Sequence, residues 1–274
     1  MTIQWSLVLF TVLTGAAGWM FTCATVDKLL GRNADKLFGA SIVAICVMAV
    51  GGIASVTHLA HPENILSALN HPTSGIFAEA VLCGLAIVAM AVFAILVKRG
   101  AAEGAQKAFA VIGAALGIIL SFVAGNSYIM SAVSTWNTVL LPIGYLCTSI
   151  PVGAALYLCM VARDATTPED VQVSAWLLIA GGILAAIASI AYVAAAGALS
   201  SLGVIACVAC VLAGGAVPAV CGYLTLKKPE KAFTMAILAL CGALVGSIAF
   251  RCIMWMAFSL AAIGAPYITD FGTL

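Results

Sequence analysis

Long apolar segments alternate with short charged segments along the whole chain. Residues 1–26, 37–62, 108–162 and 171–226 contain no Asp, Glu, Lys or Arg. A helix that spans a membrane needs about 20 consecutive apolar residues. The last two runs are each about twice that length, so each is expected to cross the membrane twice. The runs are continuous instead of alternating between polar and apolar residues, which favours helices over a β-barrel.

Clusters of polar and small residues mark the turns inside the two longest runs. Residues 126–138 hold Asn, Ser, Tyr, Trp and Thr side chains, and Gly197, Ser200 and Ser201 form a smaller break. With these turns the four runs give six spans, and the apolar segments 75–97 and 232–260, with one charged residue each, give two more. The pattern therefore predicts an all-α fold of eight transmembrane helices. Their expected bounds are Trp5–Val26, Leu37–His58, Gly75–Val97, Ala108–Ile129, Val139–Val161, Val171–Ala195, Leu202–Leu226 and Ala232–Leu260.

The composition restricts the class of protein further. The chain has 274 residues, of which 64% are hydrophobic and 8% charged. Soluble domains carry about 25% charged residues, so a soluble globular protein is excluded. Intrinsic disorder is excluded by the high hydrophobicity, and a net charge of +1 argues against a nucleic-acid partner. We expect a polytopic membrane protein, in which residues 1–274 form one helical-bundle domain without a soluble domain.

The basic residues indicate how the chain is oriented. Ten of the eleven Lys and Arg residues lie between the first and second, third and fourth, fifth and sixth, or seventh and eighth expected helices. Cytoplasmic loops of membrane proteins are enriched in Lys and Arg. We therefore expect a multi-pass protein of the cytoplasmic (inner) membrane with cytoplasmic basic loops, and both termini and the His58 loop on the outer side. The first helix has no basic segment before it and is expected to be retained instead of cleaved.

The cysteine and histidine residues argue against a metal centre or a haem in this protein. Most of the ten cysteines lie in apolar spans, where a thiol behaves as a small hydrophobic group. The Cys207-Val-Ala-Cys210 pair has no second pair nearby, whereas a zinc or iron–sulfur site takes about four ligands. The three histidines are His58, His61 and His71. No second helix supplies a partner for a bis-His haem, so we expect neither haem nor metal.

A few ionisable residues inside or beside the spans are expected at a similar depth near the outer leaflet. They are His58 and His61 after the second helix, Glu79 about one turn into the third, and Arg251 late in the eighth. An ionisable residue within a span is a hypothesis for a functional site. The alternatives are an ion pair between Glu79 and Arg251 that only stabilises the fold, and histidines in a solvated loop.

This set of side chains suits a lipid-soluble molecule with a polar head, such as a quinol. A neutral His accepts a proton near neutral pH, a carboxylate can relay the proton, and a guanidinium can hold the carboxylate ionised or bond a ring oxygen. Tyr128 and Trp136 lie in the neighbouring break, although both also suit an interfacial aromatic belt. The expected catalytic residues are His58 and Glu79. The expected quinol-binding residues are His58, His61, Glu79, Tyr128, Trp136 and Arg251.

Two stretches of the sequence resemble a known family. The first reads His-Leu-Ala-His-Pro from His58, continues to Leu69-Asn70, and reaches Glu79 at the start of the third helix. It resembles the membrane-anchor subunit of dimethyl-sulfoxide-reductase-type molybdoenzymes, where a His-Leu-Gly-x-Pro stretch precedes a Leu-Asn pair and a Glu. The polar segment 126–142 also resembles that family. The sequence departs from the family's pattern at Ala60, where Gly is usual, and at Asn64, where Arg is common.

The resemblance implies a function in anaerobic respiration. An anchor of this family oxidises a membrane quinol, commonly menaquinol, and passes electrons to a four-cluster iron–sulfur subunit and then to a molybdopterin catalytic subunit. The anchor has no haem or metal of its own. By resemblance, His58 has the quinol-binding role and Glu79 the matching acidic role. The resemblance also implies contact with membrane lipid and no nucleic-acid partner.

Three other interpretations remain open from the sequence. A small-molecule transporter or permease is the main alternative, with Pro142, Pro151 and Pro218 inside expected spans as its support. A related anchor of the polysulfide- or nitrite-reductase type would have the same task. A purely structural anchor differs from the leading interpretation only in lacking a quinol site.

Overall fold

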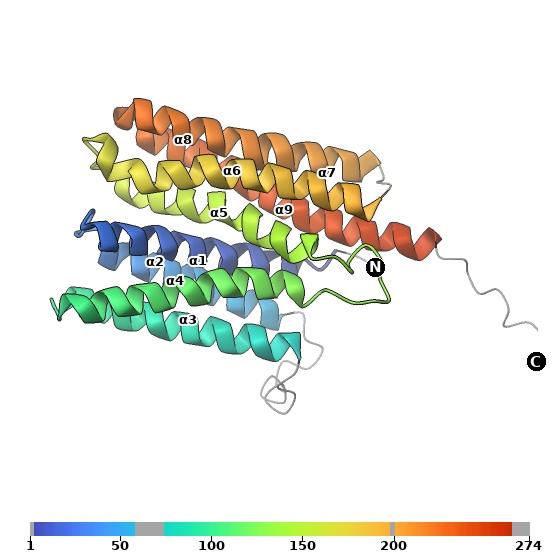
Figure 1. Ribbon diagram of the computed structural model, residues 1–274, viewed down its shortest axis with the longest axis horizontal. Coiled ribbons are helices and arrows are strands. Elements are labelled where there is room, and N and C mark those ends of the chain that lie inside the picture. The colour runs from blue at the N-terminus through green and yellow to red at the C-terminus, as the bar shows by residue number, and fades with distance from the viewer. Residues whose placement is uncertain (1–2, 58–73, 198–200, 265–274) are drawn as a thin grey trace, which may run out of the picture.

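The structure, a computed structural model, describes residues 3–57, 74–197 and 201–264. In these residues it is a bundle of helices without strands, and eight of its helices are long and apolar enough to cross a membrane, as predicted (Figure 1). The helices are α1 Trp5–Leu30, α2 Leu37–Val56, α3 Gly75–Lys98, α4 Glu103–Asn126, α5 Leu140–Val161, α6 Pro168–Ala196, α7 Ser201–Val211, α8 Val217–Lys227 and α9 Ala232–Gly264.

Three helices extend further at the charged end than the hydrophobic pattern predicts. α1 continues past Val26 to Leu30, so Asp27 lies inside the helix, and Gly31 ends it with a φ of 72°. α4 begins at Glu103, whose carboxylate pairs with Lys107 one turn later, 2.9 Å away. α6 begins at Pro168 with a capping box between Thr167 and Asp170. Local capping and i,i+4 pairs extend helices into charged sequence, which a hydrophobic pattern does not detect.

The seventh span, Ser201–Lys227, contains a change of helical type. α7 runs into a π-helical turn at Leu212–Ala216, and α8 follows with Pro218 in its first turn. Proline is tolerated in a first helical turn because no intrahelical hydrogen bond needs its missing N–H group. The predicted turn before this span is confirmed, since α6 ends at Ala196 and Gly197 adopts a φ of 86°.

The eight spans form two rings of four helices that meet along α1 and α5. In the first ring, α1 contacts α2 and α4, and α3 closes the ring between them. In the second ring, α5 contacts α6 and α9, and the seventh span closes it. The two rings meet mainly where α5 packs against α1 and α4 (Figure 1). α1 and α5 are consequently the most buried spans, and several of the buried polar side chains lie on them, among them Thr11, Asp27 and Thr148.

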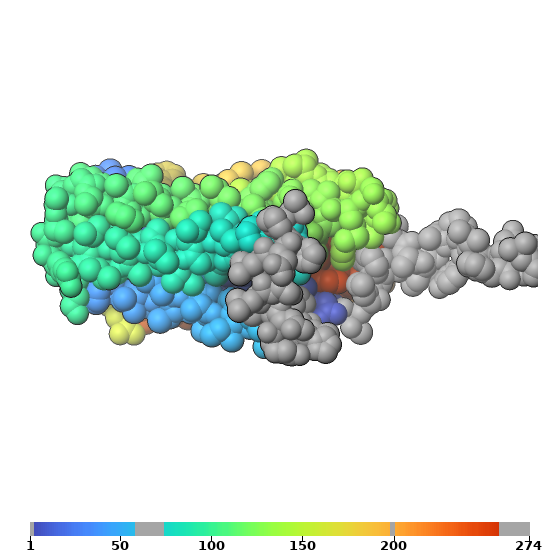
Figure 2. Space-filling model, turned by 90° about the horizontal axis from the view of Figure 1, so that it is seen from below, coloured from blue at the N-terminus to red at the C-terminus, as the bar shows by residue number. Residues whose placement is uncertain are grey.

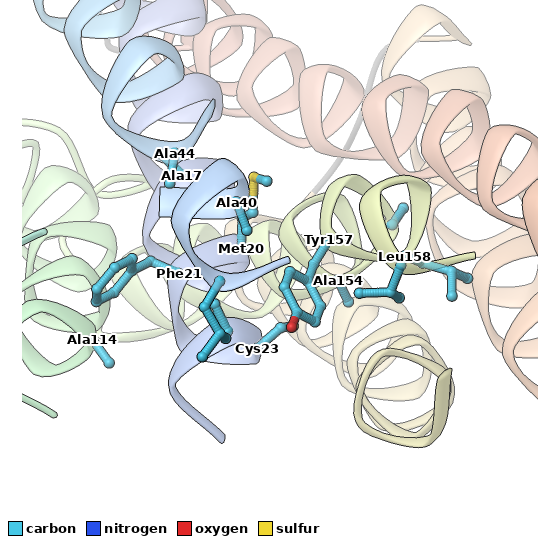
Figure 3. Close-up of a cluster of buried hydrophobic side chains, with 14 of the residues drawn as sticks. Ala17, Met20, Phe21, Cys23, Ala40, Ala44, Ala114, Ala154, Tyr157 and Leu158 are labelled. Carbon is cyan, nitrogen blue, oxygen red and sulfur yellow. The ribbon is translucent and has the colours of Figure 1, made fainter. Parts of the chain in front are cut away.

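Small residues let the helices approach closely. Figure 3 shows Ala17, Ala40 and Ala44 between larger core side chains such as Phe21 and Met20. Two Gly-x-x-x-Gly segments, Gly113–Gly117 and Gly242–Gly246, serve this packing, as small residues do in other membrane bundles. In α4, Gly117 lies so near Gly18 of α1 that an added Cβ atom would be 2.6 Å from the Gly18 Cα atom. Gly246 of α9 meets Gly214 of the π-helical turn in the same way.

The basic residues gather at one end of the bundle. Lys36 forms ion pairs with Asp35 and Asp164, which links the α1–α2 and α5–α6 connections. Arg163 lies over the Phe233 ring at 5.0 Å, and Lys98 lies over the Phe38 ring at 5.2 Å. The start of α1 and the end of α9 lie at the opposite end (Figure 1). Which end faces the cytoplasm stays a prediction from the positive charge.

Candidate functional site

The structure places four of the six predicted site residues, and all four belong to the half of the bundle opposite the basic end. Glu79 lies in the second turn of α3, and Tyr128 and Trp136 lie on the connection between α4 and α5. Arg251 lies in α9. His58 and His61 lie outside the described residues.

The start of α3 packs directly against the end of α4. Ser74 caps α3, since its hydroxyl accepts a hydrogen bond from the Phe77 amide at 3.2 Å. Gly75 lies against the Ser127 side chain, where an added Cβ atom would be only 2.7 Å from the hydroxyl oxygen. This contact brings the half-buried Glu79 carboxyl group within hydrogen-bonding reach of the Ser127 side chain. Figure 2 shows the α4–α5 connection at one end of the molecule, past the start of α3.

Aromatic side chains from three segments form a cluster next to Glu79, which we call the aromatic cluster: Tyr128, Trp136, Tyr145 and Trp255. The Tyr128 ring lies 5.7 Å from Trp136, 5.9 Å from Tyr145 and 6.0 Å from Trp255. Trp136 and Trp255 meet edge to face at 5.3 Å. Offset and edge-to-face contacts of this kind stabilise a packed aromatic group. The cluster therefore holds the α4–α5 connection against α5 and α9.

Hydrogen bonds fix this connection further. The Trp136 indole donates its Nε1–H group to the Met254 carbonyl of α9 at 3.0 Å. The Tyr192 hydroxyl of α6 donates to the Thr135 carbonyl at 3.1 Å. Trp136 is only 4% exposed, so it is a packed residue of the bundle instead of a lipid-facing member of an interfacial belt.

Arg251 is the most deeply buried cation among the described residues. Its side chain is 1% exposed, and its guanidinium group lies 4.4 Å from the centre of the Tyr145 ring. Nε donates to the Thr11 hydroxyl at 3.2 Å, and Nη1 donates to the Thr148 hydroxyl at 2.7 Å. Further bonds reach the Ser247 hydroxyl and carbonyl, the Thr11 and Tyr145 carbonyls and the Ser149 hydroxyl. Arg251 thereby joins α1, α5 and α9.

The ion pair between Glu79 and Arg251 that was one interpretation of the sequence is not formed. Among the described residues no carboxylate lies within ion-pair distance of Arg251. The reason is the direction of the arginine side chain. In a helix, side chains point back toward the N-terminus, and the Arg251 guanidinium bonds to Ser247, one turn earlier. It therefore lies about one turn deeper in the bundle than its position in the sequence suggests, while Glu79 stays near the helix end.

The aromatic cluster still connects the two charged residues electrostatically. Tyr128 has Tyr145, Glu79 and Arg251 as electrostatic neighbours. Burial raises the pKa of the Tyr128 hydroxyl above its usual value, and Tyr145 and Glu79 raise it further, while Arg251 lowers it. Tyr128 is therefore a neutral phenol at physiological pH, able to donate or accept a hydrogen bond at the site.

Comparison with known proteins assigns the family. The sequence profile of the DMSO reductase anchor subunit family (DmsC) matches residues 1–221. The C subunit of the anaerobic dimethyl sulfoxide reductase of Haemophilus influenzae is 25% identical over 188 residues, which are 66% of the present sequence and 67% of that protein. The chain belongs to the DMSO reductase anchor subunit family. It is therefore a multi-pass membrane anchor, and the transporter interpretation is not favoured.

The match to the anchor family covers most of the candidate site. Residues 1–221 include Glu79, Tyr128 and Trp136 as well as His58 and His61. Arg251 lies beyond the matched region. Its place at the site consequently rests on the structure and not on the family.

Sequence reasoning missed a second group of residues that surrounds Arg251. Tyr145, Thr148 and Ser149 are spaced at i, i+3 and i+4 in α5, and Ser247 precedes Arg251 by four residues. These spacings put each set on one helix face. A polar face on an otherwise apolar span was the signal that would have identified a buried polar network.

A buried carboxyl group at the basic end of the anchor was also missed. Asp27 is 1% exposed, and its Oδ2 atom accepts hydrogen bonds from the Tyr157 hydroxyl at 2.7 Å and the Asn33 side chain at 2.6 Å. Asn33 adopts a φ of 46° and also donates to the Asp170 carbonyl at 2.8 Å. The available signal was Gly31, because a glycine commonly follows the last turn of a helix and would have extended α1 past Asp27.

Proposed function

We propose that this anchor binds and oxidises a membrane quinol between the start of α3 and the α4–α5 connection, beside Glu79 and Tyr128. The observation that carries the proposal is the hydrogen bond of Glu79 with Ser127 and its electrostatic interaction with Tyr128 of the aromatic cluster, in a member of the anchor family. A proton acceptor next to a phenol and an apolar aromatic wall suits the ring of a quinol. His58 and His61 belong to the segment that leads into α3, and we propose them as further residues of this site.

The reaction needs acceptors for two protons and two electrons. A quinol that becomes a quinone releases both, and this protein provides the proton acceptors. We propose that His58 takes the first proton, because neutral imidazole has a free nitrogen lone pair and titrates near neutral pH. The Glu79 carboxylate accepts or relays a proton beside it. Tyr128 bonds a ring oxygen through its hydroxyl group, and Trp136 forms part of the apolar wall.

The electrons leave to a partner subunit in this proposal. Among the described residues no group of His, Cys, Asp and Glu side chains could hold a metal ion. We propose an iron–sulfur subunit with four clusters as the electron acceptor and a molybdopterin subunit as the site where the terminal acceptor is reduced. The relative from Haemophilus influenzae is named as a component of an anaerobic dimethyl sulfoxide reductase, which supports such an assembly.

The distribution of charge indicates on which side of the membrane the proposed quinol site lies. The basic connections lie at the end of the bundle opposite Glu79 and the aromatic cluster. Under the positive-inside rule that end is cytoplasmic. We therefore propose that the protein lies in the cytoplasmic (inner) membrane and that quinol is oxidised near the outer leaflet, with the protons released outside. Menaquinol is the proposed donor, by the resemblance of the sequence to the anchor family.

The test is quinol-dependent reduction of the iron–sulfur clusters in the purified complex. Reduced 2,3-dimethyl-1,4-naphthoquinone serves as the quinol, and the variants are His58→Ala and Glu79→Gln. We expect both variants to assemble and to lose at least about tenfold in the rate of cluster reduction. Glu103→Gln is the matched control, because Glu103 is an exposed acid at the other end of the bundle and pairs with Lys107. Equal rates in the wild type and both site variants would overturn the proposal.

A further inference from the structure

Arg251 carries a positive charge into the bundle core without a carboxylate to balance it among the described residues. Each of its seven hydrogen bonds ends on a neutral oxygen atom, either a hydroxyl group or a carbonyl group. A further neighbour is the face of the Tyr145 ring, which attracts cations but carries no net charge. The described core around Arg251 is therefore electrically positive.

The role of Arg251 in joining helices by hydrogen bonds does not by itself require a positive charge. A neutral side chain such as Gln can bridge hydroxyl and carbonyl groups at a smaller desolvation cost than a guanidinium group. Buried cations in proteins normally have an anionic partner. The combination of full burial and neutral partners points to an anion that is present only at some stage of the function.

The positive charge lies close enough to act on the quinol site. The guanidinium contacts the Tyr145 ring, the Tyr145 ring lies 5.9 Å from Tyr128, and Tyr128 has both Arg251 and Glu79 as electrostatic neighbours. The material between them is the aromatic cluster, which has few mobile dipoles. A charge acts over a longer distance through such a medium than through water.

Since oxidation of a quinol begins with the loss of a proton, an anion does form at this site if the proposed function is right. We propose that Arg251 is a positioning residue whose unbalanced charge stabilises the quinol monoanion beside Glu79 and Tyr128. The neutral quinol gives its first hydroxyl proton to the acceptor on the protein and becomes the monoanion. Two electrons then pass to the partner's iron–sulfur clusters, and the second proton leaves, which yields the quinone.

The charge predicts the direction of a pH effect. A nearby cation favours the ionised form of an acid, so less alkaline solution suffices to form the monoanion. The other titratable groups that face Arg251 are Tyr145, Tyr128, Cys210 and Cys252, and Glu79 faces Tyr128. Each is an acid whose ionised form is an anion, so removal of the Arg251 charge acts on all of them in the same direction. Without that charge, quinol oxidation should require a higher pH.

Four variants separate the charge of Arg251 from its structural role. Arg251→Gln removes the charge, and Arg251→Lys keeps it. Thr148→Asp leaves Arg251 in place and puts a carboxylate where the Thr148 hydroxyl now lies 2.7 Å from Nη1. Thr148→Asn has nearly the same size as Thr148→Asp but no charge. The measurement is the rate of cluster reduction by 2,3-dimethyl-1,4-naphthoquinol in the purified complex, from pH 5.5 to 9, and the readout is the midpoint of the pH profile.

We expect Arg251→Gln and Thr148→Asp to move the midpoint upward by about one pH unit, the size typical of one nearby charge. Arg251→Lys and Thr148→Asn should keep the wild-type midpoint. An unchanged midpoint in Thr148→Asp would overturn this inference, even if Arg251→Gln fails to assemble. A wild-type complex that does not oxidise the naphthoquinol at all would overturn the proposed function instead, so the two failures are distinguishable.

Discussion

Tyr157 of α5 donates its hydroxyl hydrogen to the buried Asp27 carboxyl group of α1 over 2.7 Å. Figure 3 shows the Tyr157 side chain beside Cys23, one turn before Asp27 in α1. The other carboxyl oxygen of Asp27, Oδ1, has no hydrogen-bond partner among the described residues. The contact joins the two rings of helices at the basic end, while Arg251 joins them on the other side of the core.

Loss of this hydrogen bond should destabilise the bundle. Tyr157→Phe keeps the packed ring but removes one of the two donors to a buried carboxyl group. We expect the free energy of unfolding to fall by about 1.5–3 kcal/mol, the usual size for a hydrogen bond to a charged group. Unfolding in mixed detergent micelles measures it. Tyr223→Phe is the control, because Tyr223 is 55% exposed and should give no measurable change.

Close packing between α1 and α4 predicts the effect of a single methyl group. Gly117→Ala would put its Cβ atom 2.6 Å from the Gly18 Cα atom, where only backbone is available to move. Overpacking of this kind costs about 1–3 kcal/mol. Gly84→Ala on α3 is the matched control, since an added Cβ atom there meets no atom within 4 Å. A melting temperature for Gly117→Ala at or above that of Gly84→Ala would contradict the described helix contact.

Trp136 should affect the quinol site through the position of the α4–α5 connection. Trp136→Phe retains an aromatic ring but loses the bond from Nε1 to the Met254 carbonyl. We expect KM for 2,3-dimethyl-1,4-naphthoquinol to rise several-fold with a smaller change in kcat, because the bond positions the wall and transfers no proton. Steady-state kinetics of the complex tests this. Trp176→Phe is the control, since Trp176 is 55% exposed on α6. A loss confined to kcat would instead put Trp136 in the chemistry.

The ion pairs of Lys36 predict how stability depends on pH. Hydrogen bonds to Asp164 and Asp35 raise the pKa of Lys36 above its usual 10.5. A group whose pKa is higher in the folded state contributes stability that is fully present below pH 10.5 and is lost as the pH rises through the raised value. The difference in melting temperature between the wild type and Lys36→Met should therefore disappear at strongly alkaline pH. High salt should reduce it at neutral pH.

The sidedness of the membrane protein can be measured with reporter fusions. If the basic end is cytoplasmic, green fluorescent protein fused after Arg99 should fluoresce, and alkaline phosphatase fused after Asn137 should be active. Arg99 follows α3 at the basic end, and Asn137 lies on the α4–α5 connection. The exchanged fusions provide the control and should both be inactive. The reverse pattern would move the proposed quinol site to the cytoplasmic leaflet.

The number and order of the spans were predictable because membrane burial imposes a simple constraint. A long apolar segment crosses the bilayer as a helix at low cost. The four charge-free runs and the breaks within the two longest of them defined six spans, and the apolar segments around Glu79 and Arg251 defined the other two. Asp27 is a residue whose position this constraint does not predict. A charged residue at the end of an apolar run is assigned to a loop by hydrophobicity alone, but Tyr157 and Asn33 donate hydrogen bonds to Asp27 inside the fold.

The candidate site was predictable only in part. Glu79, Tyr128 and Trp136 follow from polar residues at the ends of spans, and the structure makes Glu79 and Tyr128 electrostatic neighbours. The partners of Arg251 could not be predicted from the sequence. The sequence indicates how deep its Cα atom lies in the membrane but not the direction of its side chain. Tyr145 and Trp255 were also missed, since aromatic residues are common in apolar spans and only the fold joins them to Tyr128.

The two rings of helices imply an order of assembly during synthesis. The first ring is complete once residue 126 has left the ribosome, but Thr11 and Asp27 of its α1 helix have partners, Arg251 and Tyr157, that lie in α9 and α5. Both side chains gain these partners only after the later helices enter the bilayer. A membrane insertase or chaperone that shields these two side chains until α5 and α9 arrive would therefore assist the nascent half-protein.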